Sequence, residues 1–397
     1  MSVVGVSFAF FMGHSIILPS LALYASSLEA SSAQIGLIVA GFAIGRMAFN
    51  ALGGIAADRF GIRLVAAFGC LVTFAGALLA GAAPGINWLL AARLVQGAGS
   101  AFYLIPAYAY VASLGADDGL GRMLSLYQGT LLIGNAFGPA VGGLVATWWG
   151  LQAPNYVFAG LVAVGLVLTL VCFPGTAAQF GLTGRDRVGG RSRGAIRALM
   201  LRRVFAIPMV VCLVTFALRA GIRVTMLPLF ATAAFRFSEG QVGLLMTVAT
   251  VSNVAIIPYA GGQLDRIGRR PIVIWSMVAT ALVLVGLALT TTSWMLYLGA
   301  SLLGIVTGYA GVAPAAIAAD ISNSGRHSAA LGLQRMVSDL GIVTGPLFVG
   351  WMLGMTSFRG AFAVCALVAA GTTVVSLFMS ETLGMRGLTR HRPRATA

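Results

Sequence analysis

Residues 53–63 read GGIAADRFGIR and residues 261–270 read GGQLDRIGRR, so a charged, glycine-rich stretch occurs twice in a chain that is otherwise strongly apolar. Both copies fit G-x-x-x-D-R-x-G-x-R, with Asp58 matching Asp265 at an offset of 207 residues. Three further segments, given below, match at the same offset. Four matching segments predict two homologous halves with the same orientation, related by an axis along the membrane normal. Besides the charged stretch, the matching positions are Gln34 and Gln241, Gly36 and Gly243, Gly97 and Gly304, and Gly134, Gly138 and Pro139 with Gly341, Gly345 and Pro346.

The composition is that of a membrane protein. Of the 397 residues 59% are hydrophobic and 9% are charged, and windows of about 20 residues without a charge, long enough to cross about 30 Å of hydrocarbon, recur along the chain. We therefore predict an all-α polytopic membrane protein, with six helices in each of its two halves. The twelve expected spans are 3–24, 34–56, 64–83, 88–113, 123–147, 155–175, 204–232, 240–260, 272–290, 295–320, 331–354 and 358–380.

The basic residues predict the orientation of the chain. All 25 are arginine, and 18 of them fall in segments that are cytoplasmic if the N-terminus is cytoplasmic, against two in the opposite loops. The positive-inside rule then places both termini in the cytoplasm, in a multi-pass protein of the inner membrane. This placement accounts for the net charge of +15 without a nucleic-acid partner. The expected parts are a bundle at 1–175, a basic linker at 176–203, a second bundle at 204–382 and a basic tail at 383–397.

Other classes of protein leave signals that this sequence lacks. The four cysteines stand alone in apolar segments, so we expect no metal and no cofactor. Asp117 and Asp118 are adjacent rather than one turn apart, the three histidines are isolated, and a chain without lysine has no phosphate-binding G-K-[ST] motif. We therefore expect a transporter and not an enzyme, with a membrane-embedded enzyme as a remote alternative. A channel is not favoured, because no segment repeats more than twice, as a ring of residues around a pore would require.

The residues quoted above resemble the major facilitator superfamily over essentially the whole chain. The doubled motif is similar to that family's signature after spans two and eight, although Ile62 stands where a basic residue is usual. RLVQGAGSA at 93–101 resembles the fourth-span motif, and GNAFGPAVGG at 134–143 resembles the fifth-span motif of proton-driven exporters, although Ser125 replaces its usual first glycine. The resemblance implies alternating access, and we expect the chain to function as a monomer.

Two sets of residues follow from this resemblance. The first forms a conformational gate whose aspartates contact helix ends of the opposite half: Gly54, Asp58, Arg59, Arg63, Gly261, Asp265, Arg266 and Arg270. The second set bends or packs helices: Gly134, Gly138, Pro139, Gly142, Gly345 and Pro346.

Basic residues inside the expected spans are candidates for substrate binding, because a charge in hydrocarbon must face protein or water. The resemblance implies that spans one, four, seven and ten line a central cavity. The candidates are His14, Arg46, Arg93, Gln96, Arg219 and Arg223. Arg219 and Arg223 fit either substrate contact or a structural ion pair, and Arg93 fits either substrate contact or a gating role. Aligning Pro19 with Pro228 places His14 opposite Arg223.

Two residues are candidates for proton coupling. Of the acidic residues in the sequence, only Asp339 lies clearly inside an expected span. Its alternative role is a fixed ion pair with Arg335, one helical turn earlier. His14 is the other candidate, because an ordinary histidine side chain changes its charge near neutral pH, yet it also fits a hydrogen-bonding residue of the core. Five embedded arginines against one embedded acid favour small amphiphilic or anionic compounds as substrates, with protons as the coupling ion. The expected activity is proton-coupled export; the alternative is a proton-linked importer of a small metabolite.

Overall fold

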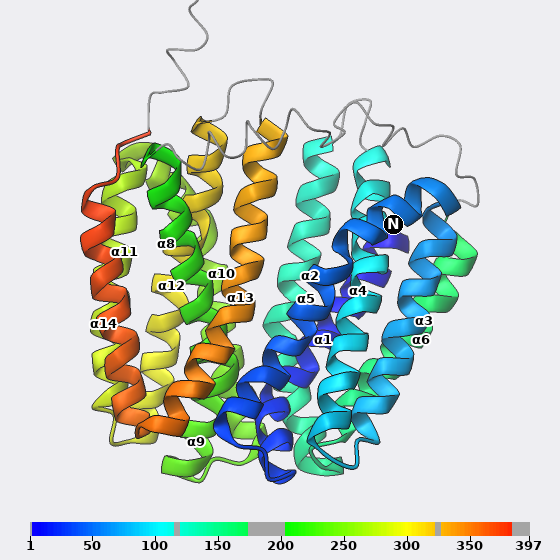
Figure 1. The fold of residues 1–397 in the computed structure, drawn as a ribbon, viewed down its shortest axis with the longest axis horizontal. Coiled ribbons are helices and arrows are strands. Elements are labelled where there is room, and N and C mark those ends of the chain that lie inside the picture. Colours follow the sequence, from blue (N-terminus) through cyan, green and yellow to red (C-terminus); the bar gives the residue numbers. More distant parts are fainter. Residues whose placement is uncertain (1, 115–119, 174–202, 322–326, 383–397) are drawn as a thin grey trace, which may run out of the picture. The chain divides into compact units, whose positions relative to one another are not determined.

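A computed structural model describes residues 2–114, 120–173, 203–321 and 327–382, and the described residues contain helices and no strand. Twelve helical segments are long and apolar enough to cross a membrane, which confirms the predicted number of spans. In the first half they are α1 (Ser2–Ser27), α2 (Ser32–Phe60), α3 (Ile62–Gly81), α4 (Ile86–Leu114), α5 (Leu120–Trp149) and α6 (Ala153–Cys172). In the second half they are α8 (Arg203–Ala220) with η2 (Gly221–Met226) and α9 (Leu227–Phe235), α10 (Glu239–Ile267), α11 (Arg269–Ala288), α12 (Ser293–Ile321), α13 (His327–Met355) and α14 (Phe358–Leu377), as Figure 1 shows.

The charged stretches that interrupt the apolar runs are more helical than their composition predicts. α2 continues to Phe60 and α3 begins at Ile62, so Asp58 and Arg59 belong to the last turn of a helix and not to a loop. The connection is the single residue Gly61, whose φ of +87° favours glycine, and Gly268 joins α10 to α11 in the same way with a φ of +113°. The glycine that the two copies share, Gly61 and Gly268, is therefore favoured by the backbone conformation of a one-residue connection.

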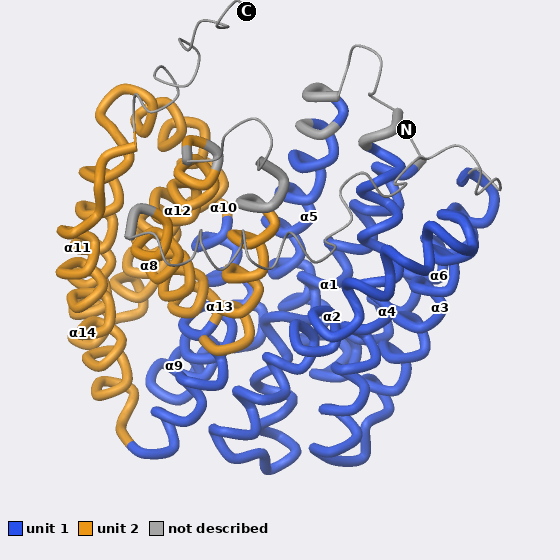
Figure 2. The backbone as a smooth tube through the Cα atoms, turned by 45° about the horizontal axis from the view of Figure 1, so that its top comes forward, with its two compact units in different colours: residues 1–187, 221–250, 346–355 blue, residues 188–220, 251–345, 356–397 orange. Residues whose placement is uncertain are grey.

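Contacts within the described residues fall into two compact units, coloured in Figure 2. Unit 1 contains 1–187, 221–250 and 346–355, and unit 2 contains 188–220, 251–345 and 356–397. Unit 1 therefore holds the first six helices together with η2, α9, the start of α10 and the end of α13. The expected basic linker, apart from Arg203, and the expected basic tail lie outside the described residues.

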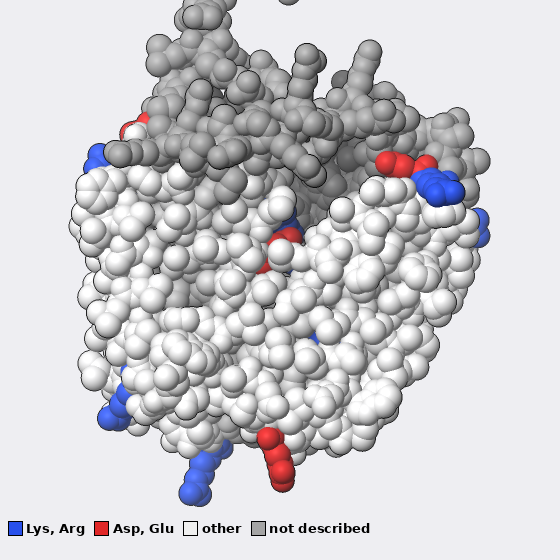
Figure 3. Space-filling model, viewed as in Figure 1, with Lys and Arg blue, Asp and Glu red and all other residues white. Residues whose placement is uncertain are grey.

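Both units are built by close helix packing. In unit 1, α2 packs on α4, α3 on α4 and α6, and α1 on α5 and α6; in unit 2, α11 packs on α12 and α14, and α8 on α12 and α14. Large apolar side chains remain on the outside, among them Trp148, Trp275 and Phe378, each about two thirds exposed or more. On the face drawn in Figure 3 most atoms belong to uncharged residues, as expected for a surface in contact with lipid.

Candidate functional site

A buried arginine and glutamine occupy α4 in unit 1. Arg93 Nη1 donates a hydrogen bond to Gln96 Oε1 at 2.5 Å, and Gln96 Nε2 donates to the carbonyl oxygen of Gly76 in α3 at 3.2 Å. The two helices come this close because Gly76 has no side chain. A Cβ on Gly76 would lie 2.9 Å from the backbone nitrogen of Gln96. Gln96 is thus held between α3 and α4 with its amide oxygen directed to Arg93.

An aromatic ring of α2 stands among three basic side chains. The centre of the Phe42 ring lies 5.1 Å from Cζ of Arg93 and 5.9 Å from Cζ of Arg46, and the ring of His14 stacks on it with centroids 4.0 Å apart. The close crossing of α2 and α4 fixes this arrangement. It requires a glycine at position 97, because a Cβ on Gly97 would lie 2.9 Å from the backbone nitrogen of Arg46. We call His14, Phe42, Arg46, Arg93 and Gln96 the basic cluster.

The guanidinium of Arg93, at the centre of the basic cluster, has no carboxylate partner among the described residues. Within those residues Arg93 Nε and His14 Nδ1 are also buried without a hydrogen-bond partner. A buried cation that is not paired carries a large desolvation cost. The cluster is therefore suited to receive an acceptor or an anion.

Span seven is interrupted between its two arginines. Arg219 lies in the last turn of α8 with its Cζ 6.0 Å from the ring of Phe216, and Arg223 lies in the π-helix η2. A π-helix bonds residues five positions apart, so Arg219 and Arg223, four residues apart, are not separated by one regular α-helical turn. Arg223 Nη1 lies 3.5 Å from Thr250 Oγ1, within unit 1, whereas Arg219 belongs to unit 2.

Contacts of corresponding glycines correct the predicted match of His14 with Arg223. A Cβ on Gly138 would lie 2.9 Å from the Met12 carbonyl oxygen, and one on its counterpart Gly345 would meet the carbonyl oxygen of Ala217. Met12 therefore corresponds to Ala217, and counting two residues onward pairs His14 with Arg219. The alignment on prolines was wrong because span seven contains η2, for which span one has no equivalent.

Asp339 of α13 is buried, and its Oδ1 lies 3.8 Å from Nε of Arg335, whose side chain is 72% exposed. The pair is long and half in solvent, so its contribution to stability is small. Ser338 directly precedes Asp339; its hydroxyl accepts a 2.8 Å hydrogen bond from the Gln334 amide, and the thiol of Cys212 in α8 lies 3.2 Å from the same hydroxyl. Polar groups thus connect α13 to α8 beside Asp339.

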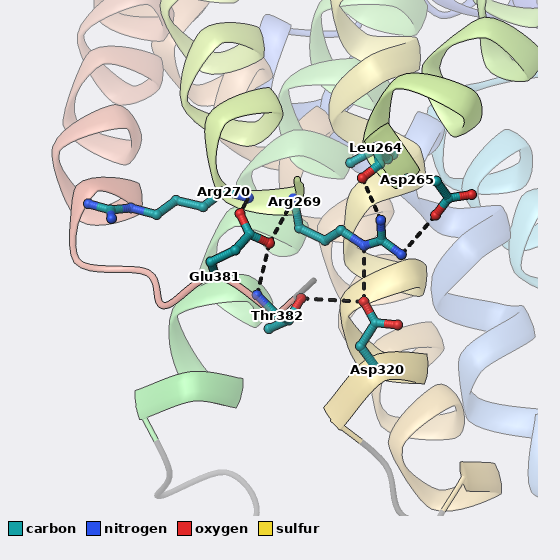
Figure 4. A network of polar contacts seen from close by, with 7 residues as sticks. All are labelled: Leu264, Asp265, Arg269, Arg270, Asp320, Glu381 and Thr382. Carbon is teal, nitrogen blue, oxygen red and sulfur yellow. Dashed lines mark hydrogen bonds and ion pairs between the residues drawn. The ribbon is translucent and has the colours of Figure 1, made fainter. Parts of the chain in front are cut away.

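The ends of α10, α11, α12 and α14 meet in a network around Arg269, drawn in Figure 4. The Arg269 guanidinium bonds Asp320 at 3.0 Å and Asp265 at 2.9 Å, and its Nη1 donates to the Leu264 carbonyl. Glu381, beyond the end of α14, accepts hydrogen bonds from the backbone nitrogens of Arg269 and Arg270 at 2.9 and 3.0 Å. A carboxylate is well suited to this place, the amino end of a helix.

The first half lacks the groups that make this network. At an offset of 207 residues, Ile62 replaces Arg269, Ser113 replaces Asp320 and Pro174 replaces Glu381. Ile62 is buried, and Asp58 is exposed near the start of the same connection. The three charged groups are thus absent together in the first half, and the two copies of the motif fold differently around the same backbone turn.

The predicted packing glycines make close backbone or side-chain contacts, whereas the two glycines of the predicted gate, Gly54 and Gly261, do not. A Cβ on Gly134 would lie 3.1 Å from the Met12 nitrogen, and a Cβ on Gly142 would meet the Ile16 carbonyl oxygen. In the charged stretch the close contact is at Gly53 and not at Gly54. A Cβ on Gly53 would lie 2.8 Å from the Ala101 carbonyl oxygen. Among the described residues, a Cβ on Gly261 would have no atom within 4 Å beyond its chain neighbours and the backbone of its own helix.

Unit 1 also contains two matching helix contacts. α5 meets α10 where a Cβ on Gly143 would lie 2.6 Å from the Glu239 carbonyl oxygen and 2.8 Å from the Cα of Gly243. α2 meets α13 where a Cβ on Gly350 would lie 2.5 Å from the Ser32 carbonyl oxygen and 2.9 Å from the Cα of Gly36. The carbonyl oxygens of Pro139 and Pro346 complete the two contacts, against Gly243 and Gly36. The offset of 207 residues relates one contact to the other; we call them the paired glycine contacts.

The structure brings His14, Arg46, Arg93 and Gln96 together as one cluster and places Asp265 and Arg270 in another. Sequence reasoning missed Phe42, Arg269, Asp320 and Glu381. The repeat held a signal for Arg269, because Ile62 at the matching position marked a difference between the halves. Nothing in the residue pattern distinguished Phe42 from other aromatic residues in apolar runs. No group of three or more metal-binding side chains occurs within the residues described.

Comparison with known proteins agrees with this architecture. The profile of the family described as Major Facilitator Superfamily matches residues 3–232 and again residues 209–395. The chain is 28% identical over 379 residues to Multidrug resistance protein MdtG of Serratia proteamaculans, covering 91% of this chain and 89% of the relative. It is 32% identical over 136 residues to Tetracycline resistance protein, class B, of Escherichia coli, covering 34% and 33%. The crystal structure of the nucleoside transporter NupG superposes with a TM-score of 0.81 at 18% identity, covering 95% of this chain and 97% of that one.

Proposed function

Because the chain belongs to the major facilitator superfamily, and is therefore a membrane transporter rather than an enzyme, we propose that it is a proton-coupled exporter. In this proposal it works by alternating access and exchanges protons for small amphiphilic or anionic compounds. It lies in the cytoplasmic membrane with both termini in the cytoplasm, since 18 of its 25 arginines fall in the segments on that side.

The paired glycine contacts are the observation that carries this proposal. They join helices of the first half to helices of the second, and they lie near Ser32 and Glu239, at the helix ends away from the charged G-x-x-x-D-R stretches. Backbone meets backbone there without intervening side chains, so the contacts can separate without the repacking of large groups. Two symmetry-related contacts of this kind suit a gate that closes the outer side.

Two observations support export. Relatives over most of the chain include proteins named for multidrug resistance and multidrug efflux. Gly138 and Gly142 of the motif that resembles proton-driven exporters also make the closest approaches between α5 and α1. The similarity to NupG shows the shared fold alone and does not favour import.

Protons require a group that changes its protonation during transport. His14 and Asp339 fit this requirement in different ways. The Nδ1 atom of His14, a member of the basic cluster, is buried without a hydrogen-bond partner among the described residues. Asp339 is a buried carboxylate inside a span, and its ion pair with the largely exposed Arg335 is long, at 3.8 Å.

Everted membrane vesicles test the direction of transport. Vesicles from cells with and without the protein are energised to acidify their interior, and uptake of a panel of dyes and aromatic carboxylates is followed. Export in the cell predicts uptake that depends on the protein and stops when nigericin collapses the pH gradient. A proton-linked importer, the alternative, would show uptake into right-side-out vesicles and none into everted ones. That result would reject the proposal.

A further inference from the structure

We propose that Arg93, with His14 beside it, binds the anionic group of the transported compound, a carboxylate or a similar oxyanion, at a site contained in unit 1. This inference rests on the proposed transport function, and it names the class of substrate and the residue that selects it. The basic cluster supplies the positive charge, and no carboxylate of the described residues pairs with Arg93.

Arg269 provides an internal comparison for Arg93. Both arginines are buried, with exposed fractions of 3% and 1%. Arg269 has two carboxylates, Asp265 and Asp320, and a backbone carbonyl around its guanidinium. Arg93 has the neutral amide of Gln96 on Nη1 and no partner on Nε among the described residues. The same chain therefore neutralises one buried arginine and leaves the other ready for an external anion.

The position of the Arg93 guanidinium is fixed before any ligand arrives. Gln96 holds Nη1, and Gln96 is itself held by the Gly76 carbonyl. A Cβ on Gly41 would lie 3.2 Å from Cβ of Arg93, so α2 packs directly on the base of the side chain. A guanidinium held by one nitrogen presents the edge that contains Nε, which is the edge that carboxylates bind through two parallel hydrogen bonds.

The rings of His14 and Phe42 determine which ligand groups fit beside the anionic group. The His14 ring stacks on Phe42 and is partly exposed, while Phe42 is 5% exposed and lies over Arg93. The His14 Nδ1, which lacks a partner among the described residues, adds a polar atom next to the guanidinium. An anion with a flat apolar body suits this combination of a basic edge and aromatic faces.

Binding of matched naphthalene compounds to the purified full-length protein tests the inference. 1-Naphthoate, 1-naphthamide and 1-naphthylmethylamine share one ring system and differ in charge, and calorimetry gives their Kd values without any proton gradient. We expect the wild type to bind naphthoate at least about 10-fold more tightly than the amide, and Arg93→Gln to weaken naphthoate binding about 30-fold or more with loss of this preference. Arg359→Gln makes the same change of charge at an exposed position of α14 and should leave all three Kd values unchanged.

Several results would overturn the inference. They are a wild type that does not prefer naphthoate to the amide, an Arg93→Gln protein that keeps the preference, and a preference that disappears in Arg219→Gln but not in Arg93→Gln. Displacement of naphthoate by phosphatidylglycerol at equal concentration would assign the site to a lipid headgroup and would also overturn it.

A structural role for Arg93 is distinguished by stability. Because its charge is unpaired, the Arg93→Gln protein without ligand should unfold thermally at the wild-type temperature or above. A lower unfolding temperature with an unchanged preference for naphthoate would mean that Arg93 only stabilises the bundle. If Arg93→Gln does not fold, Arg93→Lys decides: we expect it to bind naphthoate about 10-fold more weakly, since it keeps the charge without the fork. Binding as tight as in the wild type would contradict the inference.

The outcome is separate from that of the proposed function. Naphthoate binding that requires Arg93, in a protein whose vesicles show no proton-driven uptake, would leave the anion site standing and reject proton-coupled export. Proton-driven uptake of dyes in everted vesicles, with no effect of Arg93→Gln on naphthoate binding, would do the reverse.

Discussion

Arg269 ties the ends of four helices together in the second half. Its guanidinium is buried with Asp320, whose side chain is 2% exposed, and with Asp265, whose side chain is 72% exposed. Removing one partner of a buried ion pair leaves the other charge unpaired, which is far more costly than replacing both partners. The pair with Asp320 should therefore dominate the contribution of this network to stability.

We predict that Arg269→Ile lowers the free energy of unfolding by about 3–5 kcal/mol and that adding Asp320→Ser restores much of the loss. These substitutions install the residues that the first half carries at the matching positions 62 and 113. Unfolding of the purified protein in denaturant measures both effects, and Arg266→Leu, at an exposed position one turn before, should change stability by about 0.5 kcal/mol or less. A double variant no more stable than Arg269→Ile would contradict this account of the network.

Asp58 tests the gate of the first half. It is exposed in the last turn of α2, so Asp58→Asn should leave the stability unchanged within about 0.5 kcal/mol. If the carboxylate contacts a helix end of the other half during the cycle, the same variant should transport several-fold more slowly while binding its substrate normally. Initial transport rates and Kd values measured on one preparation separate the two effects. Transport at the wild-type rate would leave Asp58 as a helix-end residue only.

At the scale of the residue, the sequence predicts which residue types are buried, but not which groups bind their charges and hydrogen-bonding atoms. Arg93 and Arg269 are both arginines near apolar runs, and only the structure shows that one has carboxylates and the other an amide. The fold decides this by bringing together residues far apart in the chain, such as Arg269 and Glu381, which are 112 positions apart. Such pairings leave no periodic pattern in the sequence.

Helix pairs in this protein are set by glycine at backbone contacts. The paired glycine contacts join α5 to α10 and α2 to α13 with no side chain between them. Small residues permit this approach, and in a bilayer close packing supplies much of the stabilisation of helix association. A single added side chain should therefore force these helices apart.

We predict that Gly143→Val shifts the protein away from the state described here, since a Cβ would lie 2.6 Å from the Glu239 carbonyl oxygen. Spin labels at Glu29 and Met355, both exposed at the helix ends in unit 1, report the change as longer distances in a pulsed electron-resonance experiment. Gly160→Val is the matched control, because nothing lies within 4 Å of the added Cβ. An unchanged distance distribution in Gly143→Val would show that these contacts do not hold the gate.

The elements themselves were largely predictable. Apolar windows and the 207-residue offset predicted twelve spans in two halves, and the structure contains twelve. The helix ends were less predictable, because Asp58 and Arg59 look like loop residues yet complete the last turn of α2. η2 was not predictable at all, since a π-helix depends on the packing around Gly221–Met226 rather than on a local sequence signal.

For the whole molecule, family membership and the fold establish a transporter of twelve spans. The fold does not determine the substrate, the direction of transport or the coupling ion, which depend on a few side chains of the site. The basic cluster therefore carries more information about the substrate than the fold does. The paired glycine contacts and the two candidate proton carriers, His14 and Asp339, carry the information about the cycle.

The most direct test of proton-coupled export is the direction of proton movement when substrate moves. The purified protein is reconstituted in liposomes that contain a pH-sensitive dye, with no initial pH gradient, and the compound most strongly taken up by everted vesicles is added outside. Exchange predicts that protons leave the liposomes as the compound enters, so that the interior becomes alkaline, and that nothing changes in protein-free liposomes. Acidification of the interior as the compound enters would mean that protons and substrate travel together, and would contradict the account.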